Sequence, residues 1–445
     1  MTSLTYKRGQ EVLRCEPFAH ILNKQNIQEY CDYCLAFNCD GKYKQCSRCR
    51  IVQYCGRSCQ KMAWKEYHRQ ECMYLRQNSW TNISEDYVRL IFRLMIKLSK
   101  GDGIVQSKLP NGSFRGFEDL MSHKARIEND KLRMKEFQQL FEDLHTFFKD
   151  ASCQNMMPSR SKVLEIYGKT VINSLTIYNV LQDQIGSGVF LAASVFDHSC
   201  VPNATWHCIG TTLVVRALED ISVFDDVKIS YVPRLYERTS ERQELLNSMY
   251  YFLCNCSLCQ DRDSDKCKSS INCSTCGFCV PLTSENCPNC GLKIDISRLE
   301  KYAQTQKIIQ KFVLNPPDDI SLIEYILKET LKIMHCYDKD LMNFMKLAFQ
   351  KFKTNEKYEM CYVLMKPIIS NIQKHFPPFY DTLGLTFVSA AEVCLKLRRF
   401  KEAKDFIKSA EDIFKVSHGD DHPILTNGCA KIRHEIVATK SIKSK

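Results

Sequence analysis

The spacing of the cysteines constrains this chain more than any other feature of its sequence. Its 445 residues include 25 cysteines, many of them in CxxC, CxxxC or CxC pairs. Such pairs favour metal sites in a reducing compartment and disulfide bonds in a secreted protein. A histidine lies among the cysteines, and the first residues lack the apolar stretch typical of a signal peptide. We therefore expect metal sites in a soluble intracellular protein.

The first cysteine-rich segment, residues 31–72, predicts two closed zinc sites. Tetrahedral zinc takes four Cys or His ligands, so eight ligands in four pairs make two ions. The four pairs are Cys31-x2-Cys34, Cys46-x2-Cys49, Cys55-x3-Cys59 and His68-x3-Cys72. A separation of three residues fits one helical turn, so the last two pairs are expected on short helices. Apolar residues are few here, so we expect folding only with bound metal. Cys39 lies off this spacing.

Two further cysteine groups follow near the middle of the chain. Cys254, Cys256 and Cys259 offer three ligands, so a fourth must come from elsewhere in the sequence. The second group has the spacing of a zinc ribbon and predicts one more ion. Its ligands are Cys273, Cys276, Cys287 and Cys290, and Gly291 follows them. Cys267 and Cys279 lie nearby and are alternative ligands.

Apolar patterns outside the cysteine-rich segments predict an α+β protein of several domains. Residues 11–14 and 18–22 read as short strands joined by a proline turn, and residues 211–216 and 227–231 are rich in β-branched side chains. Apolar spacings of three and four predict an all-helical insert from residue 84, behind a Ser84 cap, to about residue 167.

Residues 296–445 are predicted to be helical as well. Two apolar faces on either side of Arg398, Arg399 and Phe400 read as one hairpin of a tetratricopeptide-like array, and plain bundle helices are the alternative.

Four motifs occur in an informative order in the second half of the chain. They are Asn173-Ser174, the FDHSCxPN segment of residues 196–203, Ile229-Ser230-Tyr231, and the CxCxxC of residues 254–259. This succession resembles the second half of a SET domain and its post-SET loop. The segment 31–72, with Trp64 and Tyr67, resembles a MYND zinc finger. From about residue 4 to 440 the chain resembles the SMYD family of protein lysine methyltransferases.

The resemblance implies a division of the chain into six parts. These are an N-terminal part of the SET fold (1–30), the MYND finger (31–72), a helical SET insert (73–165), the SET core (166–235), a post-SET and zinc-ribbon-like segment (236–295), and a TPR-like helical domain (296–445).

The resemblance also implies zinc and S-adenosylmethionine as cofactors. In the finger it pairs Cys31 and Cys34 with Cys55 and Cys59, and Cys46 and Cys49 with His68 and Cys72. It supplies Cys200 as the fourth ligand of the post-SET ion. The expected zinc ions are thus two in the finger, one post-SET and one in the ribbon-like group.

Site residues carry over from the family position by position. Tyr231 corresponds to the catalytic tyrosine, and His123, Asn173, Asp197 and His198 match contacts of the methyl donor. Tyr250 and Phe252 match aromatic residues that line the lysine channel and cover the donor. Their chemistry suits methyl transfer, which needs alignment of a neutral amine and no covalent intermediate.

Three departures from the family pattern stand out. Family members carry a Gly-x-Gly turn ahead of the segment that Tyr6 to Glu11 matches, so we expect either that a segment precedes Met1 or that the protein has lost activity. Asp197 replaces an asparagine, and an ionised carboxylate accepts hydrogen bonds but cannot donate them. Phe224-Asp225-Asp226 stands where a Gly-Glu-Glu type turn is common.

Three functional hypotheses follow. The first is an S-adenosylmethionine-dependent enzyme, nuclear and cytoplasmic, that methylates lysines of histones or other proteins. The second is a catalytically silent adaptor in transcriptional regulation that binds proline-rich peptides through the finger. The third is a nucleic-acid-binding regulator, suggested by the formal charge of +11 and a basic finger. Its basic residues are Lys42, Lys44, Arg48, Arg50, Arg57, Lys61 and Lys65. We expect no membrane association, because no apolar run is long enough to span a bilayer.

Overall fold

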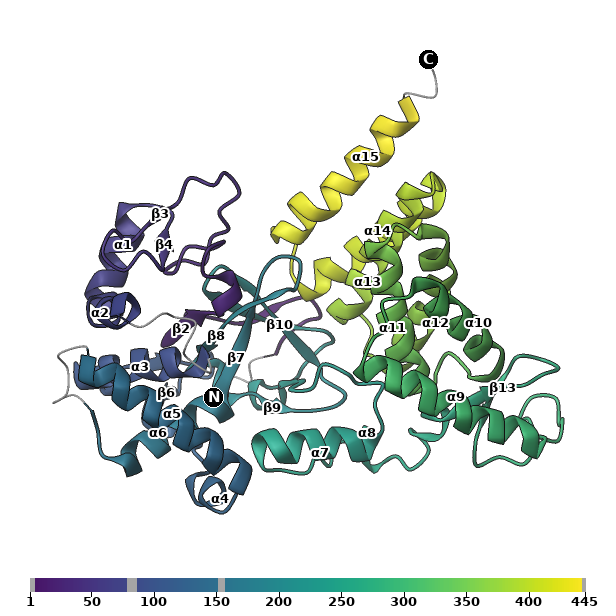
Figure 1. Ribbon diagram of the computed structural model, residues 1–445, viewed down its shortest axis with the longest axis horizontal. Coiled ribbons are helices and arrows are strands. Elements are labelled where there is room, and N and C mark those ends of the chain that lie inside the picture. Colours follow the sequence, from purple (N-terminus) through teal and green to yellow (C-terminus); the bar gives the residue numbers. More distant parts are fainter. Residues whose placement is uncertain (1–4, 78–85, 151–156, 442–445) are drawn as a thin grey trace.

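Two small antiparallel sheets form the centre of the molecule (Figure 1), a computed structural model that describes residues 5–77, 86–150 and 157–441. One sheet has the strand order β1-β11-β10 and the other β2-β8-β7. Their strands are β1 (Glu11–Cys15), β2 (Ala19–Leu22), β7 (Ser174–Tyr178), β8 (Gln184–Val189), β10 (Ala204–Ile209) and β11 (Thr212–Ala217). Each sheet thus joins one early strand to two late ones, which makes the β-fold split in sequence.

Most of the predicted strands are present, and one is shorter than expected. Residues 227–231 were predicted as a strand, but only β12 (Lys228–Ile229) forms, parallel to β9 (Asp197–His198). The pairing stops there because the Tyr231 N–H donates to the side-chain Nδ1 of His198, 2.9 Å away, and not to a backbone carbonyl. Tyr231 therefore follows the strand and lies beside His198.

The finger packs against the helical insert on one side of the sheets (Figure 1). Cys59 lies in α1 (Arg57–Ala63) and Cys72 in α2 (Arg69–Gln77), with a π-helical turn between these helices. Several zinc-ligand cysteines belong to the same buried cluster as the insert helices. The other finger strands and the insert helices are β3 (Lys44–Gln45), β4 (Gln53–Tyr54), α3 (Asp86–Ser99), α4 (Lys124–Glu128), α5 (Lys131–Asp150) and α6 (Arg160–Asn173).

The insert is not all-helical as predicted. A hairpin of β5 (Gln106–Lys108) and β6 (Phe114–Gly116) interrupts it. The turn residues Pro110-Asn111-Gly112, with Gly112 at φ 85°, explain the hairpin, because they break a helix and favour a tight turn. The Ser84 cap expected for α3 lies outside the described residues.

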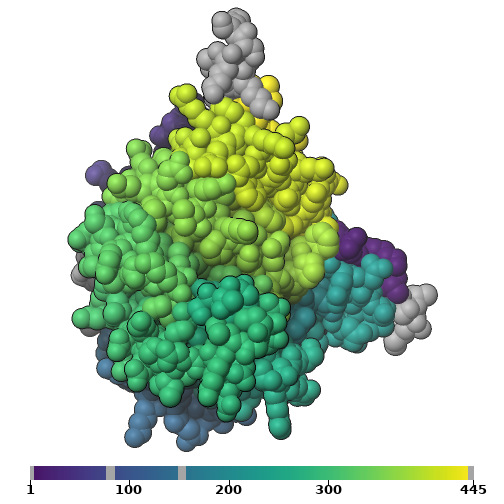
Figure 2. Space-filling model, turned by 90° about the vertical axis from the view of Figure 1, so that its right-hand side faces the viewer, coloured from purple at the N-terminus to yellow at the C-terminus, as the bar shows by residue number. Residues whose placement is uncertain are grey.

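The C-terminal half is a stack of helices on the other side of the sheets. Figure 2 views this face, which these helices cover. α11 contacts α12, α12 contacts α13, and α13 contacts α14, as in a TPR-like array. The elements are α7 (Thr239–Tyr250), α8 (Ser257–Gln260), β13 (Ser270–Asn272), β14 (Cys279–Pro281), α9 (Ile296–Leu314), α10 (Ile320–Ile333), α11 (Lys339–Thr354), α12 (Tyr358–His375), α13 (Asp381–Lys396), α14 (Phe400–Ser417) and α15 (Ala430–Ser441).

Tyr231 lies where two apolar cores meet. It packs against the buried residues of the sheets and also against those of the post-SET segment and C-terminal helices. Within the described chain no helix has the length and apolar character to cross a membrane. Tyr231 therefore lies at the boundary between the sheets and the C-terminal half of the molecule.

Candidate active site and zinc sites

The finger brings its eight candidate ligands together as two groups of four. Cys31, Cys34, Cys55 and Cys59 form one group, and Cys46, Cys49, His68 and Cys72 form the other, with all ligand atoms of a group within 4.8 Å of one another. The sulfurs of Cys34 and Cys55 lie 3.6 Å apart, and those of Cys46 and Cys72 3.8 Å apart. A tetrahedron of Zn–S bonds of about 2.3 Å requires separations near these values, so the donor sets fit zinc.

The second finger group is supported by buried charges that sequence reasoning missed. His68 Nδ1 lies 3.4 Å from Glu71 Oε2, and Glu71 also accepts hydrogen bonds from Arg89 and Arg93. Both arginines also donate to Asp32. All five side chains are at most 2% exposed. The network ties the ligand His68 to helix α3, and no local sequence signal indicates such long-range pairs.

The post-SET group consists of Cys200, Cys254, Cys256 and Cys259. Cys200 follows β9 and meets the other three from across the chain, its sulfur lying 3.6 Å from that of Cys259. The buried Arg242 donates to the sulfurs of Cys200 and Cys259, at 3.3 and 3.5 Å. A cationic group here offsets the negative charge of four thiolates around one divalent ion.

The ribbon-like group brings together Cys273, Cys276, Cys287 and Cys290. The Cys273 and Cys290 sulfurs lie 3.5 Å apart, which again fits tetrahedral zinc. Cys276 and Cys290 are exposed, unlike any ligand of the His68 group. Cys267 and Cys279 lie outside the group of four.

Seven residues singled out from the sequence line one cavity of about 590 Å³, which we call cavity A. They are His123, Asn173, Asp197, His198, Tyr231, Tyr250 and Phe252. Residues of the insert, of the segments around β9 and β12, and of the post-SET loop line it, so distant segments each contribute a side. Burial lowers the pKa of His198 to about 4 and raises the pKa of Tyr250 to about 12, which indicates that both are neutral near pH 7.

His123 lies in a tight loop ahead of α4. Its backbone is left-handed, with φ 47°, and its ring lies 5.6 Å from that of Tyr251. The loop approaches helix α6 closely at Gly168, where a methyl group would overlap the Ser122 carbonyl oxygen. Glycine at this position therefore allows His123 to reach cavity A.

His198 has protein partners on both ring nitrogens. Its Nδ1 accepts from the Tyr231 N–H, so the proton resides on Nε2, which lies 3.2 Å from the Cys200 sulfur. The ring thus links the post-SET metal group to Tyr231. The structure therefore leaves the backbone of His198, and not its ring nitrogens, for hydrogen bonds to a ligand in cavity A.

Tyr231 projects its hydroxyl to the carbonyl of Phe196, at 2.5 Å. Burial raises the pKa of Tyr231 above its ordinary value, so it keeps its proton at neutral pH. The ring centroids of Tyr250 and Phe252 lie 4.9 and 6.4 Å from that of Tyr231. These three aromatic rings form an apolar wall at one end of cavity A.

A second cavity of about 450 Å³, cavity B, lies on the other side of this wall. Tyr231 and Tyr250 line both cavities. Cavity B runs from these tyrosines between strands β7 and β10 to the start of α13. Two chambers thus share an aromatic wall, one beside the post-SET loop and one facing the C-terminal helices.

The chemistry of cavity A fits S-adenosylmethionine. Asp197 and Lys228 form an ion pair on its rim, with 2.9 Å between Lys228 Nζ and Asp197 Oδ2. This pair offers one acceptor and one donor to the ammonium and carboxylate of the ligand's amino-acid end. The aromatic wall suits a positively charged sulfur.

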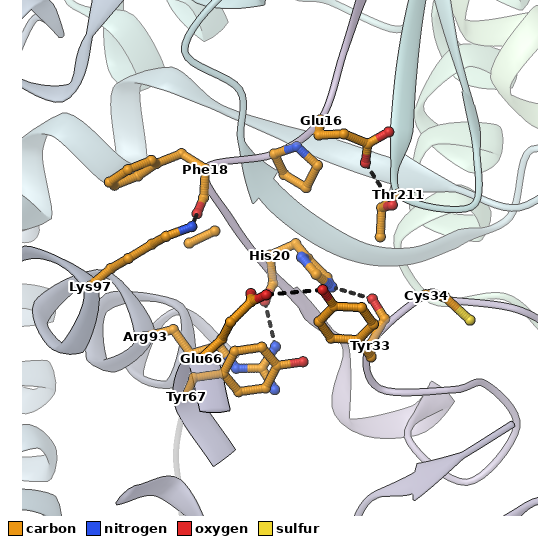
Figure 3. Close-up of a pocket in the computed structure, with 12 residues that line it drawn as sticks. Glu16, Phe18, His20, Tyr33, Cys34, Glu66, Tyr67, Arg93, Lys97 and Thr211 are labelled. Atoms are coloured by element: carbon orange, nitrogen blue, oxygen red, sulfur yellow. Dashed lines mark hydrogen bonds between the residues drawn. The ribbon is translucent and has the colours of Figure 1, made fainter. Parts of the chain in front are cut away.

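A third cavity, of about 210 Å³, lies between the finger and the sheets (Figure 3). Phe18 and Tyr33 contribute rings to its lining, and the Tyr33 hydroxyl donates to Glu66. Lys97 donates to the Phe18 carbonyl, and His20 Nε2 lies 3.0 Å from the Tyr33 carbonyl. We call it the finger cavity.

Comparison with known proteins agrees with this geometry. Residues 31–72 match the MYND finger family. The chain is 26% identical to histone-lysine N-methyltransferase SMYD3 of Mus musculus, an alignment that covers 94% of this chain and 90% of that protein. It is 26% identical to histone-lysine N-methyltransferase ASHR1 of Arabidopsis thaliana, over 97% and 92% of the two chains. N-lysine methyltransferase SMYD2 of Homo sapiens is 24% identical, over 97% and 93%.

Proposed function

This chain is a relative of the SMYD-type SET- and MYND-domain proteins, and on that premise we propose that it is an S-adenosylmethionine-dependent protein-lysine N-methyltransferase. One observation carries the proposal: seven residues from distant segments line cavity A, and the Tyr231–Tyr250 wall separates it from cavity B. The donor would occupy cavity A, and the substrate lysine would enter from cavity B and pass Tyr231.

S-adenosylmethionine, when bound, supplies a methyl group on a positively charged sulfur. Asp197 and Lys228 hold the amino-acid end, and His123, Asn173 and the His198 backbone hold the remainder. Tyr250 and Phe252 exclude water, and an apolar wall favours the neutral, nucleophilic form of the lysine amine. The Tyr231 hydroxyl, fixed by the Phe196 carbonyl, orients that amine. We expect four zinc ions, two in the finger, one at the post-SET group and one at the ribbon-like group. They would stabilise the protein around cavity A and take no part in the methyl transfer.

Isothermal titration with S-adenosylmethionine and S-adenosylhomocysteine tests the proposal directly. We expect saturable binding of one ligand per chain, followed by a mass increase of one or more methyl groups when a lysine peptide or histone mixture is added. A titration that shows no heat of binding, with a protein sample that contains its full complement of zinc, would contradict the proposal. The protein would then be an adaptor.

The finger cavity supports an interaction role beside catalysis. The aromatic residues Phe18, Tyr33 and Tyr67 line it, which suits the apolar rings of a proline-rich peptide. We propose that such peptides bind here and bring the protein to transcriptional complexes in the nucleus. We propose that the protein is present in the cytoplasm as well. Titration of a decaproline peptide into wild type and Tyr33→Ala tests this, and equal affinities would contradict it.

Nucleic-acid contact is a further proposal that the seven basic finger residues support, since all of them are exposed. Phosphate contacts release counterions, so binding of a duplex oligonucleotide should weaken steeply as salt rises. An affinity that does not change between low and moderate salt concentrations would contradict the proposal.

A further inference from the structure

Cavity B ends, on the side of the C-terminal helices, at the carboxylate of Asp381. Asp381 is the first residue of α13, and its Oδ1 accepts from the Thr382 N–H at 2.7 Å. Among the described residues Asp381 has no ion-pair partner. Burial raises the pKa of its carboxyl to about 6, so it is ionised at neutral pH. A partly buried carboxylate of this kind is stabilised when a cation binds.

Two aromatic side chains lie beside this carboxylate in the same cavity. Tyr178 ends β7 and Trp206 lies in β10, with ring centroids 5.6 Å apart and planes tilted by 41°. Both are partly exposed and line cavity B with Asp381. Burial raises the pKa of Tyr178, and the negative charge of Asp381 adds to this shift.

An aromatic pair next to an unpaired carboxylate is a chemical match for a positively charged side chain. Ring faces attract cations, and the carboxylate supplies the opposite charge and a hydrogen-bond acceptor. An apolar side chain in this place would leave the carboxylate unpaired, and an acidic one would be repelled. The cavity opens at its other end onto Tyr231 and Tyr250, so one peptide can reach both ends.

We infer that Asp381, Tyr178 and Trp206 form a recognition site for a second cationic side chain of the protein substrate, distinct from the lysine that is methylated. The inference rests on the proposed function, because it assumes that the target lysine passes the Tyr231 wall. It specifies the substrate class: lysines that have an arginine, a lysine or a methylated lysine close by in the sequence.

Paired peptides test the site. A single arginine is moved position by position around one central lysine in an otherwise alanine and glycine peptide, and each peptide has a twin with citrulline, the neutral analogue of arginine. Both kcat/KM and binding by fluorescence anisotropy are measured with the zinc-loaded full chain. Further twins carry lysine or trimethyl-lysine in place of arginine and identify which cation is preferred.

The wild-type protein should prefer arginine over citrulline by about tenfold at one or two positions, as expected for a charge-assisted contact. Asp381→Asn should bring that ratio near one while citrulline peptides react as before. Asp405→Asn removes an equal charge from an exposed position on α14 and should keep the preference. Asp381→Lys should instead prefer a peptide with glutamate over one with arginine, at the peptide position where the wild-type protein prefers arginine.

The outcomes separate the two proposals. If no peptide is methylated, the proposed function fails, and anisotropy still reports whether Asp381 selects cationic peptides. If peptides are methylated and the arginine preference survives in Asp381→Asn and Asp381→Lys, the inference is wrong. Melting temperatures of the variants within a few degrees of wild type exclude misfolding as the cause of a lost preference.

Discussion

Lys228 Nζ lies 2.9 Å from Oδ2 of Asp197, and the parallel pairing of β9 with β12 places these two residues opposite each other. An aspartate at this position cannot donate a hydrogen bond, whereas asparagine can. Lys228 supplies the missing donor from the neighbouring strand, so the pair together provides what one amide would. The substitution at position 197 is therefore compatible with a ligand site.

Lys228→Met should weaken binding of S-adenosylmethionine by about tenfold, because the ligand loses a charge-assisted contact. Stability should fall by less than about 1 kcal/mol, since the ion pair is largely exposed. Calorimetric titration and urea unfolding measure the two effects. Lys266→Met, which breaks an exposed ion pair with Asp263 outside cavity A, should alter neither.

Tyr231→Phe should lower kcat on the order of 100-fold by removing one preorganised hydroxyl. Zinc content and the affinity for the donor should stay near wild type. Tyr236→Phe is the matched control, because its hydroxyl donates to Asn343 and is buried away from both cavities. A Tyr231→Phe enzyme with normal turnover would remove the role assigned to this hydroxyl.

Glu71→Gln should damage the finger in two ways. His68 loses the carboxylate behind its ring, which should weaken zinc binding by about 10-fold to 100-fold. Arg89 and Arg93 also keep their charges in a buried site and lose one of the carboxylates that they share, so we expect a loss of roughly 3–5 kcal/mol. Zinc competition with a chelator and urea unfolding report each part. Unchanged unfolding would show that water reaches this network.

Zinc should leave the chain in a defined order when a chelator such as 4-(2-pyridylazo)resorcinol is added. The ribbon-like group has two exposed ligands and should lose its ion first, whereas the ligands of the His68 group are all buried and should lose theirs last. Native mass spectrometry should count four ions at the start. Cys276→Ser should abolish the first phase of release and leave the later phases.

Stability should fall with acid because of three buried histidines. His207 of β10 and His418 and His422 after α14 have ring centroids 4.6 Å apart in each pair, and Arg216 adds a nearby positive charge. Burial lowers the pKa of His207 to about 3 and that of His422 to about 4, and lowers that of His418 well below its ordinary value.

The unfolded chain binds protons below about pH 6.5 that these folded histidines do not bind, so the free energy of unfolding should decrease as pH falls from about 6.5 toward 4. The expected slope is about 1.4 kcal/mol per pH unit for each histidine. Urea unfolding at several pH values should therefore show a shallower dependence in His207→Leu than in wild type. Identical slopes would contradict the prediction.

Local spacing explains what the sequence could predict of the metal groups. Cys46 and Cys49, like Cys273 and Cys276, are bound to lie near each other because two residues separate them. Which pairs share an ion depends on the fold, and that came from the resemblance. The strands near residues 11 and 19 were predicted for a similar reason, since β-branched and alternating patterns act locally.

Contacts between distant residues had no comparable signal. Lys228 meets Asp197 through strand register, Arg242 meets Cys200 beside the post-SET cysteines, and His207 meets His418 across nearly half the chain. Each is one ordinary polar residue whose partner is set only by the folded topology. The hairpin of β5 and β6 was missed because the helical pattern that begins near residue 84 was extended over residues 106–116, although Pro110 and Gly112 signal a turn.

The wall formed by Tyr231 and Tyr250 has a thermodynamic consequence. A molecule in either chamber would contact the same two rings, so any change that it made in their positions would reach a molecule in the other chamber. The two occupancies are then linked, and linkage is reciprocal: any factor by which a peptide tightens the donor is also the factor by which the donor tightens the peptide. Order of addition would change the path to the ternary complex but not its total free energy.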